Sequence, residues 1–99
     1  MTEQKIQTSI IKLIESLGGY VVNGNFTKAG TPDLICCLNS KFIGIEVKKV
    51  GTEGTLKPIQ QHHLELISKS GGVAFMSTSA EHTKQQLTNY GLLPQTITV

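Results

Sequence analysis

Two strand-like segments separated by only two residues constrain the fold of this chain most strongly. Residues 33–38 and 41–48 are rich in β-branched and other apolar side chains, and they flank the turn-forming pair Asn39-Ser40. Such a pattern is typical of a β-hairpin with a tight loop. With a two-residue loop Leu38 pairs with Lys41, and each step back along the two strands adds one further pair. The sequence therefore predicts an antiparallel hairpin with a fixed register.

The segments around this hairpin predict further helices and strands. Helices are expected over residues 3–17, from Pro58 up to Gly71-Gly72 and over 80–90, and strands over 20–22 and 73–76. Thr2 is a candidate N-cap of the first helix, Pro58 suits the first turn of the second, and Thr78 opens a capping-box sequence before the third. Residues 92–99 are a candidate edge strand. The order αβββαβα predicts an α/β fold with helices flanking a mixed sheet.

Length and composition restrict the class of protein. The 99 residues suffice for one small domain, residues 1–99, and 38% hydrophobic with 16% charged residues is typical of a soluble globular protein. No apolar run approaches the roughly 20 residues of a membrane span, and the polar start does not lead into a signal-peptide core, so a cytoplasmic location is expected. The adjacent Cys36 and Cys37 favour free thiols.

The hairpin register places three ionisable side chains together. Asp33 would lie opposite Glu46, at the roughly 4.5–5.5 Å that separates cross-strand Cβ atoms, and Lys48 projects from the same face as Glu46. Two carboxylates this close repel each other unless a cation lies between them. Mg²⁺ prefers such oxygen ligands and polarises phosphoryl oxygens, so the arrangement indicates phosphodiester chemistry. The alternative is that Glu46 and Lys48 form a solvated face and Asp33 caps a turn.

Three short motifs also carry a resemblance to a known family. They are Gly-Thr-Pro-Asp-Leu-Ile at 30–35, Ile-Glu-Val-Lys-Lys at 45–49 and Pro-Ile-Gln at 58–60. In this order the chain resembles, over nearly its whole length, the virus-type replication-repair nuclease (VRR-NUC) domains of the PD-(D/E)XK nuclease superfamily. The resemblance implies a restriction-endonuclease-like core of the stand-alone type found in phages and bacteria. It also implies Mg²⁺- or Mn²⁺-dependent cleavage of branched DNA, including Holliday junctions.

The resemblance further implies roles for single residues. The implied metal positions are Asp33, Glu46 and Val47, and the implied catalytic residues are Asp33, Glu46, Lys48, Glu3 and Gln60. Glu3 would help hold the metal or its water, although an acidic residue there also complements the helix dipole. Gln60 would lie at the edge of the active site, and Gln61 is the alternative if the helix has a different register.

Charge and size indicate the partners. The net charge is +2, with nine lysines and no arginine or tryptophan, so recognition of DNA would depend on shape and backbone charge rather than on base edges. Candidate phosphate-binding residues flanking the site are Lys28, Lys41, Lys49 and Lys57, with Lys49 and Lys57 favoured. A homodimer would present two active sites to two of the strands of a junction. The alternatives are a flap or nicking nuclease, a non-catalytic DNA-binding module, or a small interaction domain without metal.

Overall fold

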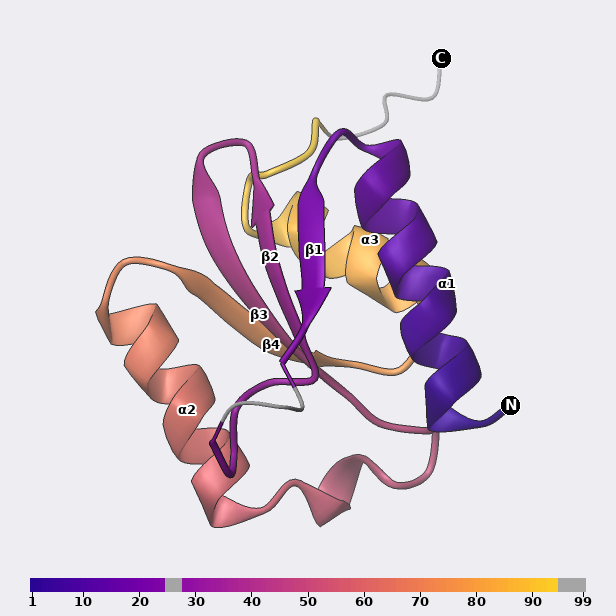
Figure 1. Cartoon of the computed structure of the whole chain (residues 1–99), viewed down its shortest axis with the longest axis vertical. Coiled ribbons are helices and arrows are strands. Elements are labelled where there is room, and N and C mark those ends of the chain that lie inside the picture. Colours follow the sequence, from indigo (N-terminus) through magenta and orange to yellow (C-terminus); the bar gives the residue numbers. More distant parts are fainter. Residues whose placement is uncertain (25–27, 95–99) are drawn as a thin grey trace.

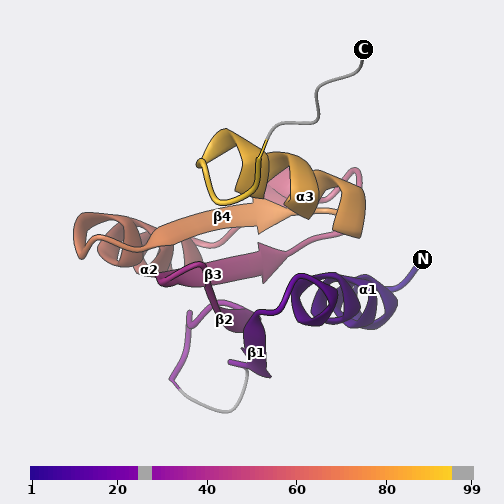
Figure 2. The same cartoon turned by 90° about the horizontal axis from the view of Figure 1, so that it is seen from above.

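A computed structural model describes residues 1–24 and 28–94 of the chain, and in them helices cover both faces of a four-stranded sheet (Figures 1 and 2). The elements are α1 (Glu3–Ser16), β1 (Tyr20–Asn23), β2 (Leu34–Leu38), β3 (Lys41–Val47), the 3₁₀ helix η1 (Glu53–Thr55), α2 (Pro58–Lys69), β4 (Val73–Ser77) and α3 (Ala80–Asn89). The predicted α/β class and the order of helices and strands are confirmed. The short η1 is an addition within a segment that the sequence predicts as a loop.

The sheet is mixed, as the sequence predicts. Its strands lie in the order β1-β2-β3-β4, with β1–β2 and β2–β3 antiparallel and β3–β4 parallel. The β2–β3 hairpin pairs Leu38 with Lys41 and continues to Leu34 with Ile45. Asn39 and Ser40 have φ angles of 50° and 66°, as a two-residue loop of type I′ requires. The predicted register of the hairpin is therefore confirmed.

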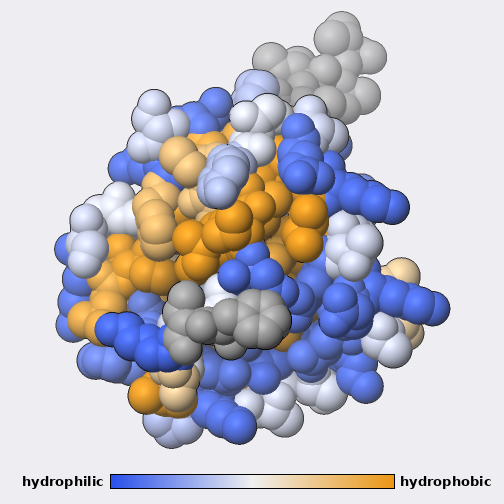
Figure 3. All heavy atoms as spheres, viewed as in Figure 1, coloured by the Kyte–Doolittle hydropathy of each residue, from blue (hydrophilic) through white to orange (hydrophobic). Residues whose placement is uncertain are grey.

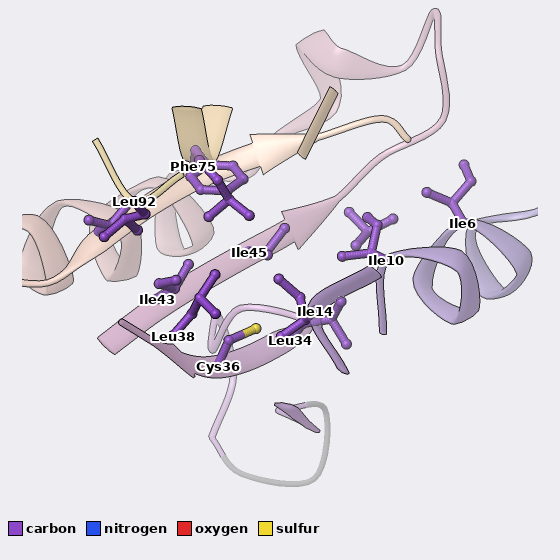
Figure 4. Packing of buried hydrophobic residues seen from close by; sticks show 13 residues of the cluster. Ile6, Ile10, Ile14, Leu34, Cys36, Leu38, Ile43, Ile45, Phe75 and Leu92 are labelled. Carbon is purple, nitrogen blue, oxygen red and sulfur yellow. The ribbon is translucent and has the colours of Figure 1, made fainter. Parts of the chain in front are cut away.

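The main core lies between the sheet and the helices α1 and α3. Figure 4 shows Ile10 and Ile14 of α1 beside Leu34 of β2 and Ile45 of β3, and all four side chains are completely buried. They come from alternate positions on the strands and from one face of the helix, which is why the periodicity of the sequence predicts them. Burying each such side chain is worth about 1.5–3 kcal/mol.

The other face of the sheet carries α2, which packs on β3 and β4 (Figure 2). Close packing here depends on Gly44, because a Cβ atom at this position would come within 2.6 Å of Ile67 Cδ1 and 3.1 Å of Pro32 Cγ. A glycine in the middle of a strand often marks such a close approach. Gly44 precedes Glu46 by two residues on the same face of β3, so it also determines how near α2 comes to the proposed site.

Three local predictions need correction or comment. The N-cap of α3 is Ser79, not Thr78: Ser79 is extended, and its Oγ accepts a hydrogen bond of 2.9 Å from the His82 N–H. Thr78 instead donates its backbone N–H to His82 Nδ1 at 3.2 Å. β1 continues to Asn23, one residue into the predicted turn. Of the candidate edge strand, residues 95–99 lie outside the described residues, and residues 92–94 form no strand.

None of the helices in the described part of the chain has the length and apolar character needed to cross a membrane.

The two cysteines differ in accessibility, which leads to a first prediction. Cys36 is 2% exposed, and its burial, together with the neighbouring Cys37, raises its pKa to about 12, whereas Cys37 is exposed on the opposite face of β2. Since the thiolate is the reactive form, a maleimide at neutral pH should modify the native protein once, and Cys37→Ser should abolish the rapid reaction. Mass spectrometry after brief labelling checks this, and rapid double modification would contradict it.

Candidate active site

Asp33 lies immediately before β2, at the end of the hairpin opposite to its turn. The regular β2–β3 ladder ends with Leu34 and Ile45, and the next interaction is made by a side chain, because Asp33 Oδ2 accepts a 2.8 Å hydrogen bond from the Val47 N–H. The carbonyl of Asp33 accepts another, also of 2.8 Å, from the Gly24 N–H. Asp33 is therefore fixed from both neighbouring strand segments, and its carboxylate is held beside β3.

Glu46 is the most strongly perturbed acid of the site. It lies on the central strand β3 and is only 3% exposed. Burial raises its pKa to about 8, and the nearby charge of Asp33 and a side-chain hydrogen bond with Asp33 act in the same direction. The two carboxyl groups therefore lie together, as the predicted register requires. Without a cation Glu46 holds a proton up to about pH 8, so the pair favours a shared positive charge.

Lys48 and Glu3 approach the same carboxyl group from different elements. Lys48 follows β3, is 8% exposed, and donates its backbone N–H to the Ser77 carbonyl of β4 at 3.0 Å. Its positive charge lowers the pKa of Glu46, and the negative charge of Glu3 raises it. Glu3 stands in the first turn of α1. The fold therefore brings the beginning of α1 and the end of β3 to one site.

Gln60 connects the site to the beginning of α2. Its Nε2 donates to Glu46 Oε2 at 3.1 Å, and its Oε1 accepts from the Lys57 N–H at 2.8 Å. Gln61 instead donates to Glu65 at 3.2 Å on the exposed side of the same helix. Of the two candidate glutamines, it is Gln60 that faces Glu46, because Gly44 lets this face of α2 approach the strand.

Val47 contributes backbone rather than side-chain groups. Its apolar side chain is completely buried, and its N–H points towards Asp33. The N–H and C=O groups of one strand residue point to the same side of the strand, so the Val47 carbonyl also lies on the side of Asp33. Among the described residues no three His, Cys, Asp or Glu side chains come together as a metal cluster. The available donors are thus two carboxylates and a carbonyl, a set that suits Mg²⁺, which completes its shell with water and phosphate oxygens.

The candidate phosphate-binding lysines lie in different places. Lys28, Lys49 and Lys57 are exposed, with Lys49 directly after Lys48 and Lys57 at the N-cap of α2. Lys41 is at the turn end of the hairpin, and its Nζ donates to the Gly71 carbonyl at 3.3 Å. Asp33 lies at the opposite end, so Lys41 does not flank the site as the sequence suggests.

One residue near the site is missing from the sequence-based set. Gln7 is a buried polar residue of α1, one turn after Glu3, and its Oε1 accepts from Asn23 Nδ2 at 3.5 Å. Asn23 directly precedes Gly24, which bonds to Asp33. The spacing of four residues from Glu3 is the signal that could have identified Gln7, since such residues share one face of a helix.

Comparison with known proteins identifies the fold. No protein-family model matches the chain, and neither does any curated protein. A solved structure described as a "VRR_NUC domain" has a TM-score of 0.75 and 26% sequence identity, and the match covers 89% of this chain and 96% of that one. The chain folds as a VRR-NUC domain. A second structure, a "VRR_NUC domain protein", has a TM-score of 0.73 and 23% identity, with 93% and 90% covered. The resemblance inferred from the three motifs is confirmed, and this VRR-NUC fold is that of a nuclease-domain family.

The contact of Gln60 leads to a second prediction. Gln60→Ala removes the hydrogen bond to Glu46. If Glu46 holds a metal, as the resemblance implies, loss of the group that orients it should cost about 10–100-fold in metal-dependent cleavage, with little change in stability. Gln61→Ala is the matched control, because it removes a neighbouring glutamine on the exposed side. Cleavage rates at saturating DNA check this, and equal rates for the two variants would contradict it.

Proposed function

We propose that this VRR-NUC domain is a metal-dependent endonuclease that cuts branched DNA, with a Holliday junction as the preferred substrate and a homodimer as the active form. The observation that carries the proposal is the close pair of carboxyl groups formed by the half-buried Asp33 and the buried Glu46, with the buried Lys48 beside it. Each group is held by the backbone of the central hairpin or by a neighbouring helix. A buried cluster of this kind, with two like charges held together, is typical of a functional site rather than of a packed core.

Mg²⁺ or Mn²⁺ is the proposed cofactor. Asp33, Glu46 and the carbonyl of Val47 would hold it, since these are hard oxygen ligands in the number that Mg²⁺ takes from proteins. When bound, the cation would neutralise the carboxylates and act as a Lewis acid towards the scissile phosphate. The raised pKa of Glu46 supports this assignment, because burial and the neighbouring Asp33 disfavour a second negative charge here unless a cation neutralises it.

The residues of the site would hold the two carboxylates in position and supply positive charge at the phosphate. Asp33 is fixed by the Val47 N–H and Glu46 by the Gln60 amide, so neither carboxylate has to reorganise when DNA binds. The ammonium group of Lys48 can neutralise charge on the phosphate or orient the attacking water. Glu3, from α1, would hold water on the remaining side of the site.

The composition supports recognition of DNA by its shape. The chain has no arginine to read guanine through two hydrogen bonds and no tryptophan to stack on bases. The exposed Lys28, Lys49 and Lys57 would contact phosphates, which fix the position of DNA without selecting a sequence. A branched DNA offers a shape that such contacts can distinguish from a linear duplex.

A panel of labelled DNA substrates tests the proposal. The protein is incubated in Mg²⁺ or Mn²⁺ with a four-way junction, a flap, a nicked duplex and a linear duplex, each with two unrelated sequences. We expect symmetric cuts in the junction, independent of sequence, and little cleavage of the linear duplex. Preferred cutting of the flap or nicked duplex would identify the alternative nuclease. Junction binding without cleavage of any substrate would identify a binding module and overturn the proposal.

A further inference from the structure

We infer that two copies of this chain pair through the outer edge of β1, about a two-fold axis at Val21, and so join their sheets into one of eight strands, four from each copy. The inference deepens the proposed function, and its link to catalysis rests on it, because a homodimer is part of that proposal. It identifies the dimer interface, which neither the sequence nor the family resemblance specifies.

Within residues 1–24 and 28–94, the outer edge of β1 lacks the features that usually protect a sheet edge. In this part of the chain β1 is the first strand of the sheet, and its strand pairing is with β2. Proteins commonly block such edges with lysine, proline or a covering helix. The four residues Tyr20–Asn23 include neither lysine nor proline. Helix α1 packs on the face of β1, where Val21 contacts the core, rather than along its outer edge (Figure 2).

The pairing with β2 determines which backbone groups of β1 point outwards. In an antiparallel pair, hydrogen-bonded and non-hydrogen-bonded residue pairs alternate. The hydrogen bond from the Gly24 N–H to the Asp33 carbonyl marks a hydrogen-bonded pair just beyond the strand. Counting back along the register, Val22 with Ile35 is again hydrogen-bonded, and Val21 with Cys36 is not. The N–H and C=O groups of Val21 therefore point away from β2, towards the open edge.

With a two-fold axis at Val21, the outward-pointing N–H and C=O groups of Val21 in both copies can all form hydrogen bonds. Val21 of each copy can donate to and accept from Val21 of the other, as in any hydrogen-bonded antiparallel pair. The same register places Tyr20 of one copy opposite Val22 of the other, twice. These side chains are 69% and 40% exposed in the single chain. An aromatic residue opposite a β-branched one is a favourable cross-strand pair, so the short strand is complementary to itself.

The absence of charge favours a second copy as the partner. A two-fold surface meets itself, so a charge near the axis would face the same charge and weaken the contact. Neither Tyr20–Asn23 nor Leu34–Leu38 includes a charged residue, although charged residues make up 16% of the chain. Figure 3 shows apolar side chains gathered over β1 and β2, with polar ones around them. This surface suits a neutral, self-complementary contact.

The pairing also relates the two proposed active sites. The axis of an antiparallel strand pair is perpendicular to the sheet, so both copies present Glu46 on the same face of the joined sheet. With strands about 4.8 Å apart and a rise of about 3.3 Å per residue, a flat sheet places the two sites roughly 30 Å apart. Two sites on one face could act on two strands of the same DNA molecule.

Oligomeric state provides the first test. Light scattering at micromolar concentration, without DNA or metal, should give a dimer for the unmodified chain and monomers for Tyr20→Lys and for Val22→Glu. Mixing these two variants should restore a dimer, because the introduced lysine and glutamate lie opposite each other across the axis. Val50→Lys is the control, since Val50 is 78% exposed but lies outside β1 and β2. Matching circular dichroism spectra would verify that the variants fold.

Disulfide formation tests the register itself. In a background with Cys37→Ser, Tyr20→Cys and Val22→Cys are prepared separately and then mixed under mild oxidation. Opposed non-hydrogen-bonded residues have Cα atoms about 4.5 Å apart, within the range that a disulfide spans. The mixture should give a cross-linked dimer, and each variant alone should not.

A monomeric unmodified chain, or a dimer that Tyr20→Lys leaves intact, would overturn the inference. Neither measurement uses DNA or metal, so failure of the proposed nuclease activity would leave these results unchanged. Conversely, a strictly monomeric protein that cuts junctions would refute this interface and retain the nuclease.

Discussion

Asp33→Asn and Lys48→Ala are each expected to reduce metal-dependent cleavage of a four-way DNA junction by at least about 10²–10³-fold, the usual cost of removing one group that stabilises developing charge. Asp33→Asn removes a negative charge from the proposed metal site, but the amide oxygen can still accept the hydrogen bond from the Val47 N–H. Lys48→Ala removes the positive charge beside the carboxyl pair and leaves its backbone bond to Ser77 in place. Both variants should therefore fold and bind junction DNA.

The measurement compares single-turnover cleavage rates in Mg²⁺ with junction binding in Ca²⁺. Lys41→Ala is the matched control, because it removes the same charge from the far end of the hairpin. Its cleavage rate should stay within about threefold of the unmodified protein, as for other solvated surface charges. Cleavage that survives Asp33→Asn would show that this carboxylate does not carry the reaction.

Glu46→Gln is expected to have opposite effects on activity and on stability. The pKa of Glu46 is about 8 in the folded protein, against an ordinary value of 4.5, so the folded state binds its proton more tightly than the unfolded state does. Without metal, stability should therefore fall as the pH rises from about 4.5 to 8. Glutamine cannot ionise, so the variant avoids this loss, which amounts to at most about 5 kcal/mol well above pH 8.

Urea unfolding in EDTA at pH 4 and pH 8.5 measures this effect. The two proteins should be similar at pH 4, and Glu46→Gln should be more stable at pH 8.5, while its junction cleavage falls by about 10²-fold or more. Added Mg²⁺ should stabilise the unmodified protein more than the variant, since a ligand stabilises the state that binds it. A stability difference that does not change with pH would contradict the proposed environment of Glu46.

The central hairpin could be predicted because its information is local. A loop of two residues fixes the register of the strands on both sides, and this register brings Asp33 to Glu46. The helices were predictable for a similar reason, since apolar spacing and a candidate cap such as Thr2 lie within the segment itself. The family resemblance predicted roles for residues outside the hairpin, because their closeness to it cannot be inferred from their spacing in the sequence.

The remaining features depend on contacts between distant segments. The choice between Gln60 and Gln61 depends on the rotation of α2 relative to the sheet, which Gly44 and its contact with Ile67 help to set. Ser79 rather than Thr78 caps α3, and both residue types are good caps, so the sequence could not separate them. The outward direction of the Val21 backbone groups follows only from the pairing of β1 with β2, which the sequence does not specify.

Titration calorimetry with Mn²⁺ and Mg²⁺, comparing the unmodified protein with Asp33→Asn in the absence of DNA, tests the metal site most directly. If Asp33 and Glu46 hold the catalytic cation, the unmodified protein binds the metal saturably and Asp33→Asn binds it at least about tenfold more weakly. Binding should also release protons near neutral pH, because Glu46 is protonated up to about pH 8 in the metal-free protein. No binding to the unmodified protein, or equal binding to both proteins, would contradict the assignment of this carboxyl pair as a metal-dependent nuclease site.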